Sequence, residues 1–306
     1  MKIGIVGIGA MGSVYAGLLA AAGHEVWGID TWAEHVRAIR AGGLDVSGAS
    51  GARVVRLHAT TDATEVGPCD LVILATKAAD VSAAGRAAAT LLGPDTPVLT
   101  IQNGLGAVDA LAGVIARERI LVGVAGGFGA SLSGPGRVHH NGMELIRLGE
   151  ADGGVSARVE AVAAVWADAG FTVRCYADIN QLVWEKFICN VTFSGPCTVL
   201  DMTVGEVMAN AHAWPLALGC GLEAWQAGVA SGIAFSFDDP RTYIGDFGAK
   251  IPHARPSMLL DHRAGRRSEI DHINGRVALV ARQAGTTAPL NEAITALVRA
   301  REERFD

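Results

Sequence analysis

The sequence predicts an α/β protein in which an N-terminal parallel-sheet domain is followed by an all-α C-terminal domain. Short apolar runs alternate with alanine-rich segments from the first residue to about residue 150, which is typical of a parallel sheet with helices on both faces. A glycine-rich turn joins the first of these runs to the first helix. After residue 178 the strand patterns stop and long helical segments follow, so the predicted domains are residues 1–177 and 178–306.

The apolar, β-branched runs have the length of strands that are buried on both faces. We expect such strands at residues 2–7, 25–29, 70–75, 97–101 and 120–125, with helices at 13–22, 80–92 and 107–117. A hairpin-type addition at 137–149, a helix at 154–169 and a strand at 171–175 should complete the first domain. The second domain should hold helices at 178–193, 204–232, 255–264 and 269–284, and one from Asn291 onward. Gly195-Pro196 should end or kink the first of them.

The first strand runs directly into a Gly-x-Gly-x-x-Gly turn, whose residues are Gly7, Ile8, Gly9, Ala10, Met11 and Gly12. A helix and a second strand follow, and the second strand ends at Asp30. In this setting the first glycine allows a tight turn, the second lets the backbone approach a pyrophosphate, and the third lets the helix pack on the strand. The helix N-terminus adds N–H groups for the phosphates. The pattern predicts a Rossmann-type dinucleotide site; the alternative is a glycine-rich turn of another doubly wound protein.

Composition excludes several other classes of function. A net charge of −6 provides no basic surface for nucleic acid or an anionic membrane. The five cysteines are scattered and lack a Cys-x-x-Cys pair, so we expect neither a disulfide framework nor a metal site. Glycines interrupt the uncharged stretch at residues 3–23, which therefore fits a buried strand and helix and not a signal or membrane segment. The expected location is the cytoplasm.

Polar residues with possible chemistry occur in both domains. Lys77 and Asn103 follow predicted strands, at the same sheet edge as the glycine turn, where open parallel sheets bind ligands. In the helical part, Lys186, Asn190 and Ser194 are four residues apart and share one helix face. A lysine in so apolar a helix either extends to the surface or points into a cleft as a proton donor.

In this order the motifs resemble those of the ketopantoate reductase (2-dehydropantoate 2-reductase) family. The segments that carry the resemblance are the glycine turn, Lys77, Gln102-Asn103-Gly104, Gly134-Pro135-Gly136, Trp184-Glu185-Lys186, Pro256-Ser257-Met258-Leu259, Ser268-Glu269-Ile270-Asp271 and Pro289-Leu290-Asn291. The resemblance implies a Rossmann domain, a helical domain and an active site in the cleft between them. It also implies that a nicotinamide cofactor, NAD(P), reduces a 2-oxo acid to a 2-hydroxy acid.

The resemblance also implies the roles of individual residues. Lys186, as proton donor, and Glu269 match catalytic positions of the family. The matching substrate-binding positions are Asn103, Asn190, Ser194 and Ser257. The cofactor would contact the glycine turn, Asp30, Thr31, Lys77 and Asn103. A homodimer is expected from the spare apolar faces of the helical domain.

Two positions depart from the family pattern. Thr31 stands where NADP-using members carry an arginine, and Asp30 suits a ribose hydroxyl and repels a phosphate, so we expect NADH to be preferred. Ser194 stands where a second asparagine is common, so the 2-oxo acid can differ from 2-dehydropantoate. The alternatives are an NAD-dependent D-2-hydroxyacid dehydrogenase, an imine or β-hydroxyacid reductase on the same scaffold, and a non-catalytic cofactor-sensing protein.

Overall fold

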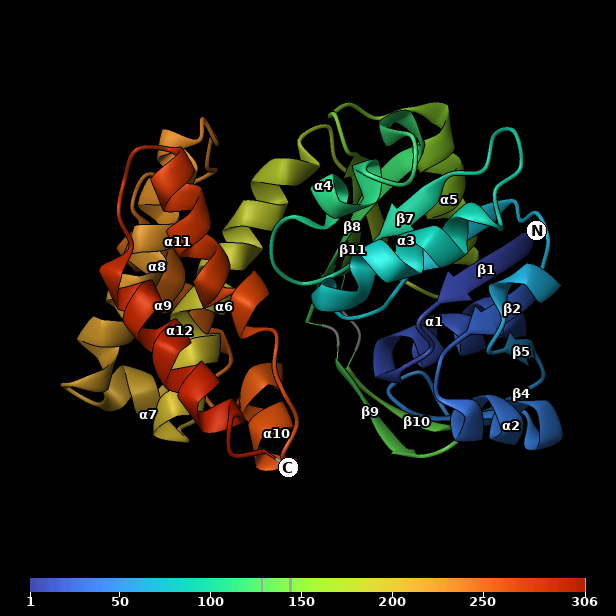
Figure 1. Ribbon diagram of the computed structural model, residues 1–306, viewed down its shortest axis with the longest axis horizontal. Coiled ribbons are helices and arrows are strands. Elements are labelled where there is room, and N and C mark those ends of the chain that lie inside the picture. The colour runs from blue at the N-terminus through green and yellow to red at the C-terminus, as the bar shows by residue number, and fades with distance from the viewer. Residues whose placement is uncertain (128, 143–144, 306) are drawn as a thin grey trace. The chain divides into compact units, whose positions relative to one another are not determined.

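An eight-stranded, mostly parallel sheet organises the N-terminal part of the chain (Figure 1). The computed structural model describes residues 1–127, 129–142 and 145–305. The strands are β1 (Lys2–Val6), β2 (Glu25–Ile29), β5 (His58–Thr60), β6 (Leu71–Leu74), β7 (Val98–Thr100), β8 (Ile120–Gly126), β11 (Leu145–Glu150) and β12 (Val173–Cys175), in the order β12-β11-β8-β7-β6-β1-β2-β5. Strand β11 is antiparallel to β8, and the other neighbouring pairs are parallel. The predicted fold class is therefore confirmed.

Both faces of this sheet are covered. The helices around it are α1 (Ala10–Ala21), α2 (Ala33–Gly42), α3 (Val81–Ala89), α4 (Ala107–Ala112) and α5 (Ala157–Asp168), with 3₁₀ turns at Ala63–Glu65, Ala78–Asp80 and Arg117–Arg119. On β1, Ile3 and Ile5 belong to the core cluster that contains Trp166 of α5. Gly4 lies between them and faces Leu91, just beyond α3. Since alternate strand residues face opposite sides, the central strands must be apolar throughout, as β6 and β8 are.

A second, four-stranded sheet lies beside α1, and the sequence patterns did not predict it. Its strands are β3 (Leu44–Gly48), β4 (Arg53–Val55), β9 (Gly129–Gly134) and β10 (Arg137–Gly142), in the order β4-β3-β10-β9. Helix α1 packs against both β2 of the first sheet and β10 of the second. Gly17 permits this approach, because a Cβ there would lie 2.7 Å from Val46 Cγ2.

The expected hairpin at residues 137–149 is wrong. Residues 137–142 form β10, which pairs with the preceding strand β9, whereas residues 145–150 form β11 in the main sheet. The hairpin turn is therefore Pro135-Gly136, between β9 and β10, where Gly136 has a φ of +70°. Met143 and Glu144, within the predicted hairpin, lie outside the described residues.

His35 on α2 joins α1, α2 and the β9–β10 turn through buried hydrogen bonds. The Ser13 hydroxyl donates to the carbonyl oxygen of Ile8 at 2.7 Å and lies 3.1 Å from His35 Nε2. Because the hydroxyl proton is directed to Ile8, Nε2 must be the donor to Ser13. His35 Nδ1 accepts from the backbone N–H of Gly136 at 3.0 Å. These bonds select the neutral Nε2–H tautomer, in a side chain that is wholly buried.

Burial holds the pKa of His35 below its ordinary value, although Asp30 acts in the opposite direction. The unfolded protein, in which the histidine pKa is about 6.5, therefore binds a proton at a higher pH than the folded protein does. Above that pH both states are neutral and the full stability is present; as the pH falls below it, protonation of the unfolded state lowers the free energy of unfolding. We expect the free energy of unfolding to fall more steeply from roughly pH 7 to pH 5 in the wild type than in His35→Asn. The difference in slope should be at most about 1.4 kcal/mol per pH unit.

Urea denaturation of both proteins at each pH measures this difference. The pKa values of His24 and His140 are also lowered by burial, but both proteins share these residues and their contributions cancel. Parallel stability curves for the two proteins would show that His35 titrates alike in the folded and unfolded states.

The rest of the chain is helical. Its elements are α6 (Ile179–Leu200), α7 (Val204–Ala209), α8 (Ala213–Ala230), α9 (Pro240–Lys250), α10 (Ser257–Arg263), the 3₁₀ turn η4 (Ile270–His272), α11 (Asn274–Gln283) and α12 (Pro289–Glu302). The chain divides into two compact units: one holds residues 1–102 and 106–179, and the other holds Asn103–Leu105 and the residues from Asn180 onward. None of the helices in the described ranges is both long and apolar enough to cross a membrane.

Of the two effects expected of Gly195-Pro196, an end or a kink, helix α6 does not show the end, because it continues through them to Leu200. Proline costs an internal helix roughly 3 kcal/mol or more. Burial offsets that cost, because Val191, Phe193 and Cys197 around it are at most 3% exposed. Gly195 is needed for this packing, since a Cβ there would lie 2.6 Å from Asn274 Oδ1 of α11.

Two other expected helices are interrupted. The predicted helix at 204–232 is split into α7 and α8 at Asn210, whose Oδ1 accepts the backbone N–H groups of His212 and Ala213 at 2.9 and 3.0 Å. This local side-chain bond competes with helix continuation. The predicted helix at 269–284 is likewise split into η4 and α11.

A buried polar network joins four helices of the second unit. Asn274 Nδ2 donates to the Val191 carbonyl of α6 and to Asn291 Oδ1 of α12. Asn291 Nδ2 in turn donates to the Cys220 carbonyl and to Glu223 of α8, at 3.0 and 2.8 Å. The family-like segment Pro289-Leu290-Asn291 therefore has a structural role, because Asn291 satisfies buried polar groups between helices.

Candidate active site

In the glycine turn between β1 and α1, the first and third glycines are closely packed and the second is not. Gly7 has a φ of +90°, and a Cβ there would lie 2.7 Å from the backbone nitrogen of Thr76. A Cβ at Gly12 would overlap the carbonyl oxygen of Gly7. A Cβ at Gly9, in contrast, would have no heavy atom within 4 Å. Gly7 and Gly12 are thus required by packing, whereas Gly9 borders open space where a phosphate could approach.

The surroundings of this turn fit an anionic dinucleotide. The first N–H groups of α1 lack intrahelical acceptors, as in every helix, and they point toward the helix N-terminus. Thr76, which contacts Gly7, has a buried hydroxyl oxygen without a hydrogen-bond partner among the described residues. Sequence reasoning did not single out Thr76. Its position directly after β6, at the strand edge that binds ligands in such sheets, was the available signal.

The three other predicted cofactor contacts in the first unit lie in loops. Asp30 directly follows β2, and its Oδ1 accepts the backbone N–H of Trp32 at 2.9 Å. Its second carboxylate oxygen has no hydrogen bond to any described residue. Thr31 is exposed, and Lys77 is exposed at the start of a 3₁₀ turn. Asp30 therefore retains an acceptor for a hydroxyl group.

Lys186 and Asn103 are brought into direct contact. Lys186 Nζ, on α6, donates a hydrogen bond to Asn103 Oδ1 at 2.8 Å, and both side chains are half-buried. Asn103 comes from the loop after β7 but belongs to the second compact unit together with Lys186. The ammonium group therefore has a defined position, set by an amide oxygen.

The loop that carries Asn103 is fixed at both ends. Gln102 Nε2 donates to the carbonyl oxygen of Leu74 at 2.8 Å, and the Thr100 hydroxyl donates to Gln102 Oε1, so the ends of β6 and β7 are joined. Gly104 has a φ of +86°, and a Cβ there would overlap the carbonyl oxygen of His272. Only glycine allows this approach to η4. The Gln-Asn-Gly motif thus places Asn103 through the residues on either side of it.

The remaining predicted site residues differ in exposure. On α6, Asn190 is half-buried, whereas Ser194 is only 5% exposed. Ser257 is exposed at the first position of α10. Glu269 is half-buried and directly precedes η4, the turn on which Gly104 packs. Among the predicted catalytic and substrate-binding residues, Lys186 and Asn103 form a direct hydrogen bond.

Glu185, next to Lys186, was not predicted as a site residue. Its side chain is 6% exposed, and its Oε1 accepts from Gln181 Nε2 at 3.0 Å and from the backbone N–H of Ser236 at 2.8 Å. These bonds attach the loop between α8 and α9 to the helix that carries Lys186. A buried carboxylate with such partners supports the structure around the lysine.

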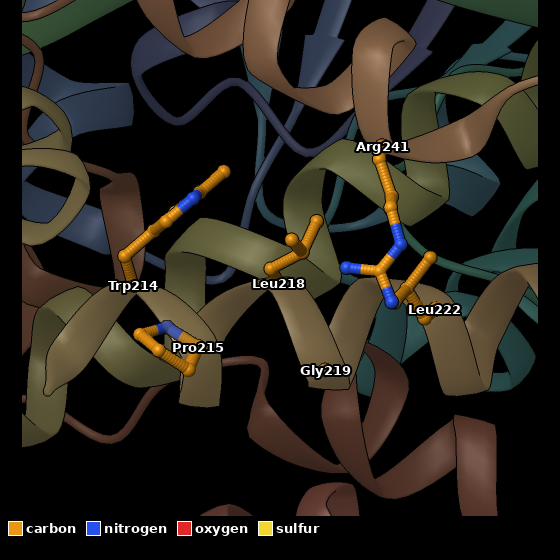
Figure 2. A pocket seen from close by; sticks show the side chains of 6 residues that line it. All are labelled: Trp214, Pro215, Leu218, Gly219, Leu222 and Arg241. Atoms are coloured by element: carbon orange, nitrogen blue, oxygen red, sulfur yellow. The ribbon is translucent and has the colours of Figure 1, made fainter. Parts of the chain in front are cut away.

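A separate pocket of about 460 Å³ lies between α8 and α9 (Figure 2). Its wall on α8 is made by Trp214, Pro215, Leu218, Gly219 and Leu222, and Arg241 of α9 reaches toward Leu222. The pocket contains none of the predicted site residues.

Comparison with known proteins agrees with these features. The family "Ketopantoate reductase PanE/ApbA" matches residues 3–153, and "Ketopantoate reductase PanE/ApbA C terminal" matches residues 178–302. The 2-dehydropantoate 2-reductases of Streptococcus pyogenes serotype M1 and Pyrococcus horikoshii are each 31% identical to the chain, over 99% of it and 98% of their own length.

Solved structures are similar over the same extent. A PanE/ApbA family ketopantoate reductase from Ralstonia eutropha JMP134 has a TM-score of 0.91 at 29% identity and covers 99% of both chains. D-mandelate dehydrogenase with NADH and anilino(oxo)acetate has a TM-score of 0.90 at 28% identity, covering 100% of this chain and 99% of its own. Since family similarity extends over both parts of the sequence and full-length relatives reach 31% identity, the chain belongs to the ketopantoate reductase family.

Proposed function

We propose that this protein uses NADH to reduce a 2-oxo acid, 2-dehydropantoate or a related compound, to the 2-hydroxy acid, with Lys186 as the proton donor. The observation that carries the proposal is the hydrogen bond from Lys186 Nζ to Asn103 Oδ1 at 2.8 Å. Family membership supports the reaction class, because relatives along the full chain are 2-dehydropantoate 2-reductases.

The chemistry requires a positioned cation. When bound, the reduced nicotinamide supplies a hydride to the carbonyl carbon, so that negative charge develops on the carbonyl oxygen. The Lys186 ammonium stabilises that charge and transfers a proton to the oxygen. Asn103 holds the ammonium through one of its three N–H donors, which limits the directions of the others.

The other predicted residues hold the substrate or the lysine. Asn190 lies on the same face of α6 as Lys186, one turn away, and its amide can bind the substrate's polar groups. Ser257 is accessible for the same role, whereas the buried Ser194 sets the space available on that face. We assign Glu269 to positioning Lys186 and to the proton balance of the site.

A D-2-hydroxyacid dehydrogenase is the second candidate. Ser194 leaves more room than the asparagine common at that position, and D-mandelate dehydrogenase with bound NADH has the same fold. Such an enzyme would accept a bulkier 2-oxo acid. Both candidates use the same proton donor and differ in the size of the accepted side chain.

A substrate panel tests the function. NADH oxidation is followed spectrophotometrically with 2-dehydropantoate, pyruvate, phenylglyoxylate and a cyclic imine. We expect turnover with 2-oxo acids and none with the imine. Preference for 2-dehydropantoate supports the first candidate, and preference for phenylglyoxylate the second. NADH binding without turnover of any 2-oxo acid would favour a cofactor-sensing protein, and turnover of the imine alone would favour an imine reductase.

A further inference from the structure

We propose that Ser13 and His35 are positioning residues for the dinucleotide, because together they aim the backbone N–H of Gly9 at the pyrophosphate. This inference rests on the proposed function, since it concerns the affinity of the same cofactor site. Neither residue touches the open space beside Gly9: both are wholly buried behind the glycine turn.

The geometry of the peptide between Ile8 and Gly9 carries the inference. In a trans peptide the carbonyl oxygen and the following N–H point in opposite directions, and the described chain has no cis peptide bond. The carbonyl of Ile8 points inward, where the Ser13 hydroxyl donates to it at 2.7 Å. The N–H of Gly9 must therefore point away from Ser13. Gly9 borders open space, because a Cβ there would meet nothing within 4 Å.

His35 makes this orientation stable. A serine hydroxyl in the first turns of a helix can also bond to the carbonyl four residues earlier, which here is Gly9. The bond from His35 Nε2–H, with nitrogen and oxygen 3.1 Å apart, occupies a lone pair of the Ser13 oxygen and favours donation to Ile8. His35 is held in turn by the N–H of Gly136 in the β9–β10 turn. The family-like Gly134-Pro135-Gly136 segment is thereby connected to the cofactor turn.

Two substitutions of His35 separate its two bonds. Glutamine places an amide near the position of Nε2 and can keep the bond to Ser13, whereas asparagine places its amide near Nδ1 and can keep the bond to Gly136. If His35 acts through Ser13, His35→Gln should retain cofactor affinity and His35→Asn should not. If His35 only stabilised the fold, there would be no reason for His35→Gln to keep a higher cofactor affinity than His35→Asn.

Titration calorimetry with ADP-ribose measures affinity without catalysis. We expect Ser13→Ala to raise the Kd roughly tenfold, the scale of one weakened hydrogen bond. We expect His35→Asn to raise it about threefold or more and His35→Gln to stay within about twofold of the wild type. In steady-state assays the KM for NADH should rise in Ser13→Ala, while kcat and the KM for the 2-oxo acid stay unchanged. If Ser13→Ala does not fold, the two His35 variants carry the test.

Thr192→Val is the matched control, because Thr192 makes the same buried hydroxyl-to-carbonyl bond to Ile188 at 2.9 Å in the helical unit. It should leave the Kd of ADP-ribose unchanged. Wild-type affinity in Ser13→Ala, or equal losses in the two His35 variants, would overturn the inference. Absence of ADP-ribose binding by the wild type would instead overturn the dinucleotide site of the proposed function.

Discussion

Replacement of Lys186 by alanine should lower kcat for the 2-oxo acid by roughly 10²- to 10⁴-fold, the usual effect of losing a positioned proton donor. The variant loses both the cation that stabilises the developing oxyanion and the proton that completes the reaction. NADH affinity should change little, because all the proposed cofactor contacts except Asn103 lie on the glycine turn and on the loops after β2 and β6. Stopped-flow measurement of NADH oxidation, with NADH binding determined separately, tests both statements.

Two further variants make the Lys186 experiment specific. Lys186→Arg keeps a cation but not a usable proton donor, since a guanidinium stays protonated at neutral pH. We expect it to recover part of the lost rate, and that part measures charge stabilisation alone. Lys250→Ala is the matched control, because Lys250 is exposed in the last turn of α9. Near-normal kcat in Lys186→Ala would remove Lys186 from the mechanism.

The central strands β1, β6, β7 and β8 of the main sheet were predictable because they are buried on both faces, whereas the edge strand β5 was not predicted. That burial leaves uninterrupted apolar runs such as Leu71–Leu74, whose neighbours in the sequence are turns. The second sheet was not predictable in this way. Strand β4 has three residues, two of them exposed, and β9 alternates half-buried and exposed positions over a segment rich in glycine and serine. Such strands are stabilised by their neighbours, β3 beside β4 and β10 beside β9, together with α1, and not by their own pattern.

The candidate site was predictable in its residue types but not in its contacts. The spacing of the glycines and of Lys186, Asn190 and Ser194 is local information that a sequence displays directly. The bond between Lys186 and Asn103 joins residues 83 positions apart. It depends on a positive φ at Gly104 and on the close approach of that glycine to His272, which are tertiary properties. The bonds of Ser13 and His35 were missed for the same reason.

The double substitution Asp30→Ala, Thr31→Arg should change the ratio of kcat/KM for NADPH to that for NADH by roughly 10- to 100-fold in favour of NADPH. Asp30 keeps one carboxylate oxygen without a partner among the described residues, since only Oδ1 binds the N–H of Trp32. That oxygen can accept a ribose hydroxyl and would repel a 2′-phosphate. An arginine at position 31, which is exposed, would supply a bidentate partner for the phosphate.

The single variants separate the two causes of the change in cofactor ratio, which are the loss of the Asp30 carboxylate and the gain of an arginine at position 31. Asp30→Ala should mainly weaken NADH use, because it removes the hydroxyl acceptor, whereas Thr31→Arg alone should gain little with NADPH while the carboxylate remains. Glu34→Ala is the control for net charge, because it removes an exposed carboxylate from α2 that pairs with Arg37, and it should leave the cofactor ratio unchanged. Steady-state assays with both cofactors give the ratio for the wild type and for each of the four variants. The argument from Asp30 and Thr31 would be wrong if the unmodified protein already used NADPH more efficiently than NADH, because the carboxylate would then have to tolerate a phosphate beside it.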